Sequence, residues 1–100
     1  MKLKDLARVV RSKNAGPCRL TLDVMFERPE DFQRARVSGA FAVEAIARLY
    51  GLPAADVQII DYAVANAIKV VMNRRVTAGD PGDRDVYGAQ QHAPMLELEI

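Results

Sequence analysis

The chain has 100 residues, half of them hydrophobic, which predicts one compact domain and leaves no room for two. Lys and Arg number 14 against 13 for Asp and Glu, and a net charge of +1 lacks the concentrated positive field that binds a phosphate backbone, so no nucleic-acid partner is expected. Cys18 is the only cysteine, which excludes an internal disulfide and favours a reducing cytoplasm. Because no run of about 18 apolar residues is uninterrupted, neither a membrane span nor an export signal is expected.

Two strands are predicted in the first quarter of the chain. Residues 3–11 place apolar residues between charges, and the Gly16-Pro17 pair that follows ends the segment. Residues 18–26 alternate apolar and polar side chains, as a half-buried strand does. On its apolar face a thiol usually packs as a small apolar group, so Cys18 is expected to be buried.

Two helices are predicted next. Pro29 suits the first helical position, and Glu30 and Asp31 complement the helix dipole, so a short helix should run to about Val37. After a break at Ser38-Gly39, apolar residues recur at helical spacing over residues 41–49, and Gly51 supplies a C-terminal stop. This apolar stripe is expected to cover the inward face of strand 18–26.

The remaining elements are predicted as strands. Residues 57–64 and 67–73 form a hairpin around Ala65-Asn66, and residues 95–100, with the sequence MLELEI, alternate as a last strand. Short links favour antiparallel pairing, so the prediction is a two-layer α+β sandwich with a mostly antiparallel sheet and helices on one face. Within a single domain 1–100, residues 1–78 form the core, 79–94 a long held loop, and 95–100 the terminal strand. The expected core consists of Leu20, Leu22, Val24, Phe26, Phe41, Ile46, Leu49, Ile59, Ile68 and Val70.

The first candidate site is a predicted exposed loop over residues 12–16. Its polar residues, with neighbouring arginines, can bind a carboxylate or phosphate through backbone amides and cations; a polar hairpin connection is the alternative. The candidate contacts are Arg11, Ser12, Lys13, Asn14 and Gly16, with Arg8 and Arg19 nearby.

The second candidate is the segment GDPGDRDVYGAQQHAP, residues 79–94. Three Asp residues and His92 contain donors suited to a divalent ion. Their spacing matches no calcium or zinc motif, so the Asp residues are interpreted as turn residues. No metal or cofactor is therefore expected. His92 has the pKa range of a general base without a marked nucleophile beside it, so no catalytic residue is assigned. The segment either binds a partner or covers an edge of its own sheet. The interface or site residues proposed are Asp80, Asp83, Tyr87, Gln90, Gln91 and His92.

The segments that contain the two candidate sites also resemble the motifs of a known protein family. The pattern LxDLAxVxRSKNAGP at residues 3–17 and the pattern GDPGDxDVYGAQQHAP followed by an acidic apolar end at residues 79–100 resemble domain-of-unknown-function family 4387, a family of short bacterial proteins. That family is similar to the C-terminal ferredoxin-fold domain of the acyclic terpene utilisation proteins. The resemblance implies a ferredoxin-like fold and a large partner chain of that type, but no catalytic residues.

Two functions are therefore expected from different classes. The first, which the resemblance implies, is an accessory or site-completing subunit of a heteromeric enzyme that acts on a carboxylic acid or acyl thioester. The second is a stand-alone homo-oligomeric lyase or isomerase whose site forms between subunits from Lys13, Asp83 and His92.

Overall fold

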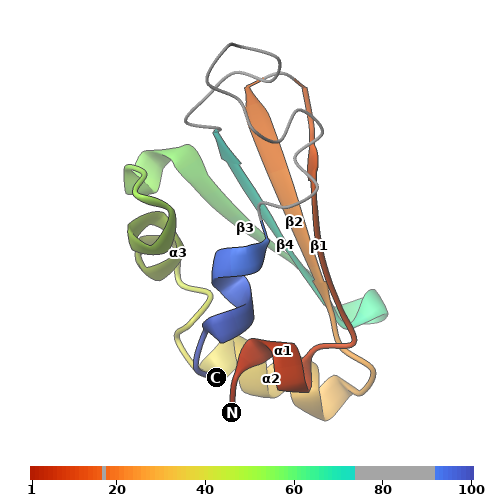
Figure 1. The fold of residues 1–100 in the computed structure, drawn as a ribbon. Coiled ribbons are helices and arrows are strands. Elements are labelled where there is room, and N and C mark those ends of the chain that lie inside the picture. The colour runs from red at the N-terminus through yellow and green to blue at the C-terminus, as the bar shows by residue number, and fades with distance from the viewer. Residues whose placement is uncertain (17, 74–91) are drawn as a thin grey trace.

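The computed structural model describes residues 1–16, 18–73 and 92–100. Figure 1 shows its helices and strands. In chain order they are α1 (Leu3–Leu6), β1 (Val9–Asn14), β2 (Arg19–Met25), α2 (Pro29–Val37), α3 (Val43–Tyr50), the 3₁₀ turn η1 (Ala54–Asp56), β3 (Val57–Tyr62), the 3₁₀ turn η2 (Ala63–Ala65), β4 (Ala67–Asn73) and the 3₁₀ helix η3 (Ala93–Glu97).

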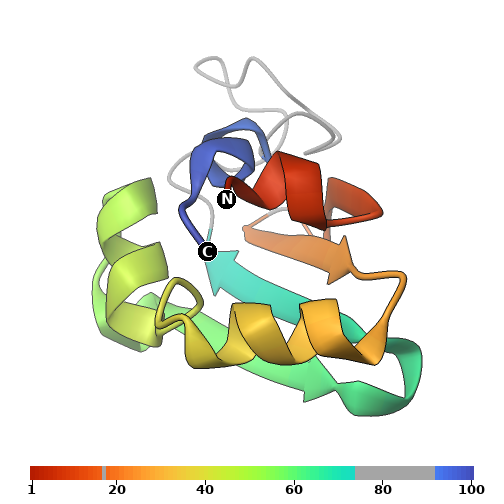
Figure 2. The same cartoon turned by 90° about the horizontal axis from the view of Figure 1, so that it is seen from below.

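The four strands form one antiparallel sheet in the order β1-β2-β4-β3. Because β4 lies antiparallel between β2 and β3, those two strands run parallel, and α2 and α3 connect them. This is the split β-α-β unit of ferredoxin-like sandwiches. The helices and η3 gather on one side of the sheet, so among the described residues one face is covered by helices and the other, called the open face, is not (Figure 2). The predicted two-layer α+β sandwich is confirmed.

The two long helices form for the reasons read from the sequence. Pro29 stands in the first turn of α2 beside Glu30 and Asp31, and the helix ends at Val37 as predicted. Helix α3 ends at Gly51, whose φ of 66° is left-handed, and the Gly51 amide donates to carbonyls of the last turn. Both helix predictions are confirmed, although α3 begins at Val43, later than expected.

The predicted strand over residues 3–11 is wrong in its first half. Leu3–Leu6 is a helical turn, which places the i and i+3 leucines on one side and buries Leu3 completely. The strand begins only at Val9, and it continues to Asn14 through residues that were expected to form a loop.

The predicted terminal strand over residues 95–100 is also wrong. Ala93–Glu97 forms a 3₁₀ helix, and one bridge, between Glu99 and Lys2, joins the tail to the N-terminal segment. The amide of Leu3 donates to the carbonyl of Leu98 at 2.8 Å, and the amide of Ile100 donates to the carbonyl of Met1 at 2.8 Å. The alternating pattern predicted a strand with one buried face, but Met95 is the only residue of η3 that is buried, and the 3₁₀ helix inserts its side chain into the core.

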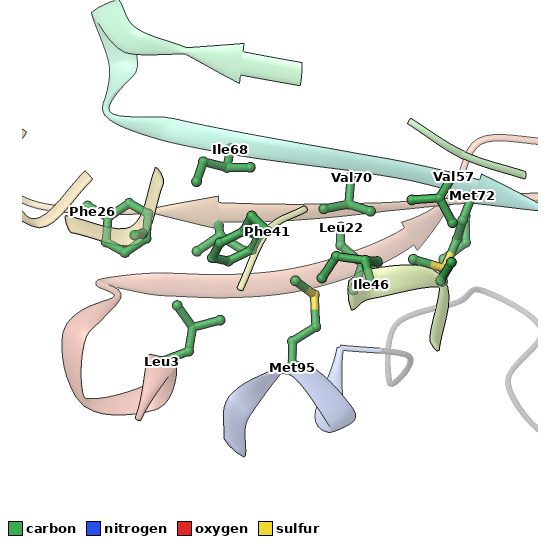
Figure 3. Close-up of a cluster of buried hydrophobic side chains, with 14 of the residues drawn as sticks. Leu3, Leu22, Phe26, Phe41, Ile46, Val57, Ile68, Val70, Met72 and Met95 are labelled. Carbon is green, nitrogen blue, oxygen red and sulfur yellow. The ribbon is translucent and has the colours of Figure 1, made fainter. Parts of the chain in front are cut away.

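The core lies between the sheet and the helices (Figure 3). Eight of the ten predicted core residues are buried. Ile59, on the edge strand β3, is only partly buried against the core. Leu49 is 37% exposed, because α3 turns Ile46 and Ala47 inward instead. The residues that the prediction missed include Leu3, Phe32, Val57, Met72 and Met95.

Cys18 is exposed, so the prediction of a buried thiol is wrong. Strand β2 begins at Arg19, so Cys18 precedes the strand and is not held on its apolar face.

Candidate functional site

Strand β1 divides the polar residues of the first candidate site between the two faces of the sheet. Ser12 pairs with Leu22 and Asn14 with Leu20, so both lie at positions on the covered face with the core. Arg11 and Lys13 alternate with them and occupy the open face. The prediction of a loop is therefore wrong for residues 12–14, because a polar edge strand has no apolar periodicity by which to recognise it. Anion binding by these residues stays a prediction, with its cations on the opposite face from Ser12.

The turn that follows β1 contains the last residue of this candidate site. Gly16 has a φ of 103°, a left-handed value that strains other residues. The amide of Ala15 donates to the carbonyl of Arg19 at 3.0 Å and closes the hairpin. Only residues 15 and 16 of the predicted loop thus lie in the connection.

The covered face brings together two residues that are far apart in the chain. Ser12 Oγ lies 3.4 Å from His92 Nδ1, although 80 positions separate the residues. Ser12 is only 7% exposed, and His92 is partly buried. One residue of the opening motif and one residue of the closing motif therefore meet at one place, although no pattern in the sequence predicted a nucleophile near His92. The signal that could have indicated it is a serine at an inward-facing strand position.

Both members of the Ser12–His92 pair are held by regular structure. Ser12 is held by the antiparallel pairing of β1 with β2. His92 is the N-cap residue of η3, and its carbonyl accepts a hydrogen bond from the amide of Met95 at 3.0 Å. The fully buried Met95 side chain points from η3 towards the sheet, as Figure 3 shows. The contact is thus positioned by a sheet edge and by a buried anchor.

Charges at the two chain ends add to this anchoring. Glu97 Oε1 lies 2.9 Å from Lys4 Nζ, Glu97 Oε2 lies 3.1 Å from Lys2 Nζ, and Glu99 Oε2 lies 3.2 Å from the N-terminal ammonium. The hydrogen bonds from Lys4 and Lys2 lower the pKa of Glu97, and the ammonium lowers the pKa of Glu99. These groups are exposed, so each pair contributes little by itself.

A hydroxyl beside an imidazole has a defined chemical repertoire. Depending on the tautomer, Ser12 donates to Nδ1 or Nδ1 donates to Oγ. The 3.4 Å separation is long for proton transfer between the two groups, but such contacts tighten when substrate binds. An imidazole can act as a general acid or a general base, and a hydroxyl can donate a hydrogen bond to a carbonyl oxygen.

The cations in and beside the opening motif differ in whether they form an ion pair. Arg11 Nε lies 3.3 Å from Asp23 Oδ2, and the Asp23 side chain is only 14% exposed. Lys13 and Arg19 are exposed and form no ion pair within the part of the chain that the structure describes. The amide of Ala15 donates to the backbone carbonyl of Arg19, so the main chain of Arg19 lies beside the turn. The expected role of the neighbouring arginines in binding an anion stays a prediction.

Of the second candidate site, the structure places only His92. Asp80, Asp83, Tyr87, Gln90 and Gln91 lie outside the described residues, and their interface or site role stays a prediction. Within residues 1–16, 18–73 and 92–100, no three His, Cys, Asp or Glu side chains gather where they could hold a metal ion. Over the same ranges, no helix has the length and apolarity needed to cross a membrane.

Comparison with known proteins identifies the family without identifying a function. Neither curated proteins nor solved structures gave a match. A family model described as a domain of unknown function, DUF4387, matches residues 3–99 and so spans both motifs and every element described above. The chain belongs to the DUF4387 family.

Proposed function

We propose that this protein is a site-completing subunit of a heteromeric enzyme that acts on a carboxylic acid or an acyl thioester, and that Ser12 and His92 form its contribution to the site. The observation that carries the proposal is the 3.4 Å contact between Ser12 Oγ and His92 Nδ1. A contact between the two motif segments, made across the whole length of the chain, favours one shared site over two unrelated surface features.

The chemistry of the pair fits this class of substrate. Enzymes acting on acids and thioesters stabilise developing charge on a carbonyl oxygen, and a positioned hydroxyl is one suitable donor. Reactions beside a carbonyl also move protons, for which histidine suits neutral pH. The Ser12 hydroxyl on edge strand β1 and the His92 imidazole at the start of η3 supply both functions at one edge of the sheet, where a partner chain can provide the remaining groups.

The partner we propose is the large chain of acyclic terpene utilisation type that the sequence resemblance implies, in a cytoplasmic complex. The open face of the sheet lies on the side away from the helices (Figure 2), whereas Ser12 lies on the covered face. One face can therefore meet a partner while the other contributes to the site.

The test is co-expression with the large chain, followed by assays of assembly and turnover. Ser12→Ala and His92→Ala should each lower kcat by about 10²-fold or more, in the range typical of lost general acid-base groups, while the complex still co-purifies. Ser38→Ala is the matched control, since its Oγ bonds only the carbonyl of Ala35 and the amide of Ala40 at the end of α2. Full turnover in both site variants, or a large chain that never co-purifies with the wild type, would contradict the proposal.

A second candidate function has a specific observation in its favour. Lys13 lies on the open face and Ser12 on the covered face, so a site that unites Lys13 with His92 needs a second copy of the chain. This arrangement favours a homo-oligomeric lyase or isomerase with its site between subunits. Turnover of an acid or thioester by the purified protein alone, rising steeply with protein concentration, would support this candidate against the first.

A further inference from the structure

We propose that the open face of the sheet is a docking surface for an acidic patch on a partner protein. The face consists of the strand side chains that alternate away from the helices. Its charged residues are Arg11, Lys13, Arg19, Lys69 and Asp23. Four cations against one carboxylate concentrate positive charge on one face of a chain whose net charge is only +1.

Part of this charge is already engaged within the face. Asp23 pairs with Arg11 at 3.3 Å, and Lys69 Nζ lies 5.9 Å from the centre of the Tyr62 ring. Lys13 and Arg19 form no ion pair with any residue that the structure describes. The available positive charge is therefore concentrated where β1 ends and β2 begins.

A small hollow lies beside Arg19 at this end of the face. Its polar lining consists of Arg19, Gln58, Asn73 and Asp56. Asn73 Nδ2 donates to Asp56 Oδ1 at 3.0 Å, which engages that carboxylate and orients the amide. A guanidinium flanked by amides recognises a carboxylate well, since it can donate two parallel hydrogen bonds.

Apolar side chains lie between the charges, as they do in protein interfaces. Met25, Ile60 and Val71 are each partly exposed on this face. A partner surface that places Glu or Asp residues around an apolar centre would match both features.

Two other occupants fit less well. A second copy docked through the same face would bring the two cationic surfaces together, which is repulsive. Single-stranded nucleic acid binds sheets through several stacked aromatic residues, whereas Tyr62 is the one aromatic side chain at the outward positions of the described strands, and Lys69 already lies over it.

The direct test is an NMR titration of the isotope-labelled protein with a short acidic peptide of Glu and Leu residues, using a peptide with Gln in place of Glu as the control. Only the acidic peptide should bind, with amide shifts on the strands and not on α2 or α3. Lys13→Glu with Arg19→Glu should weaken binding about 10-fold or more, as lost charge pairs do, and Lys13→Gln with Arg19→Gln should weaken it in the same direction.

The matched control is Arg34→Glu with Arg48→Glu, which makes the same change in net charge at exposed positions of α2 and α3. This variant should bind with an unchanged dissociation constant. Equal loss in the two charge-reversed variants would overturn the proposal, because it would show a response to net charge only. Tighter binding of a single-stranded oligonucleotide on the same face, or a dimer that the Lys13 and Arg19 changes dissociate, would also overturn it.

Identification of the natural occupant as the large chain rests on the proposed function, and co-purification separates the two ideas. Loss of the large chain from the Lys13→Glu, Arg19→Glu variant, with retention by the Arg34→Glu, Arg48→Glu variant, is the expected result. If both variants retain it, the large chain does not dock on this face and the proposed function stands. If the wild type never retains it, the proposed function fails, and the peptide titration still decides on the face.

Discussion

Replacing Met95 with Ala should detach the C-terminal tail while leaving the sheet folded. Met95 is fully buried, and core substitutions of Met by Ala cost about 2–5 kcal/mol. The 3₁₀ helix that carries it is short and lies near the chain end, so it can open locally, and local opening limits the measurable cost. We therefore expect the free energy of unfolding to fall by about 2–3 kcal/mol, the lower part of that range.

Urea unfolding followed by circular dichroism measures this cost, and hydrogen exchange locates it. In the variant, the amide of Leu3, which donates to the carbonyl of Leu98, should exchange much faster, whereas amides in β2 and β4 should keep most of their protection. Because His92 directly precedes η3, its ring resonances should also shift as the contact with Ser12 is lost.

Leu96→Ala is the matched control, because the neighbouring Leu96 is only partly buried. It should cost less than about 1 kcal/mol, in keeping with its smaller burial. The reasoning is refuted if Met95→Ala costs no more than Leu96→Ala, or if Leu3 keeps its protection, since either result would mean that Met95 does not anchor the tail.

Three further predictions concern the core and the pH dependence of stability. Phe26→Ala should lower the free energy of unfolding by about 3–5 kcal/mol in urea titrations, since the ring is buried and meets Phe32 edge-on at 6.5 Å; an unchanged midpoint would contradict the packing. The folded pKa values of Glu97 and Glu99 are lowered, so their contribution to stability is present above the unfolded pKa of about 4.3 and lost as the pH falls through the folded values. Thermal melts should therefore show a smaller acid decline in Glu97→Gln with Glu99→Gln than in the wild type, and equal declines would argue against these pairs. Burial raises the pKa of Tyr50, so its contribution is present below the unfolded pKa of about 10 and is lost as the pH rises above it; Tyr50→Phe should lose less stability there, and parallel alkaline curves would contradict this.

The elements that were predicted well have strong local signals. Strand β2 alternates regularly because it lies inside the sheet with one face on the core. Helix α2 has Pro29 in its first turn, and α3 has Gly51 after its last. In both helices one residue type meets a backbone requirement that few others meet, so the local sequence was sufficient to predict the helix end.

The elements that were predicted wrongly lie at the two ends of the chain, where tertiary contacts overrule local pattern. Residues 3–6 and 93–97 each form a short helical segment and insert one fully buried side chain, Leu3 or Met95, into the core. Neither segment is long enough to show helical periodicity, which needs a window of about 11–18 residues. Their structure depends on each other, through the hydrogen bonds that join the tail to the N-terminal segment.

The contact between Ser12 and His92 could not be predicted from the sequence for a related reason. Whether Ser12 faces the core depends on where β1 begins, because a shift of one residue in a strand moves every side chain to the other face. No local pattern predicts that boundary or the approach of η3, whose N-cap is His92. A strand read as ending at residue 11 left Ser12 and Lys13 in one loop, whereas the observed register assigns them to separate faces. We propose proton transfer on the covered face and docking on the open face, and this assignment of the two roles depends on the register of one edge strand.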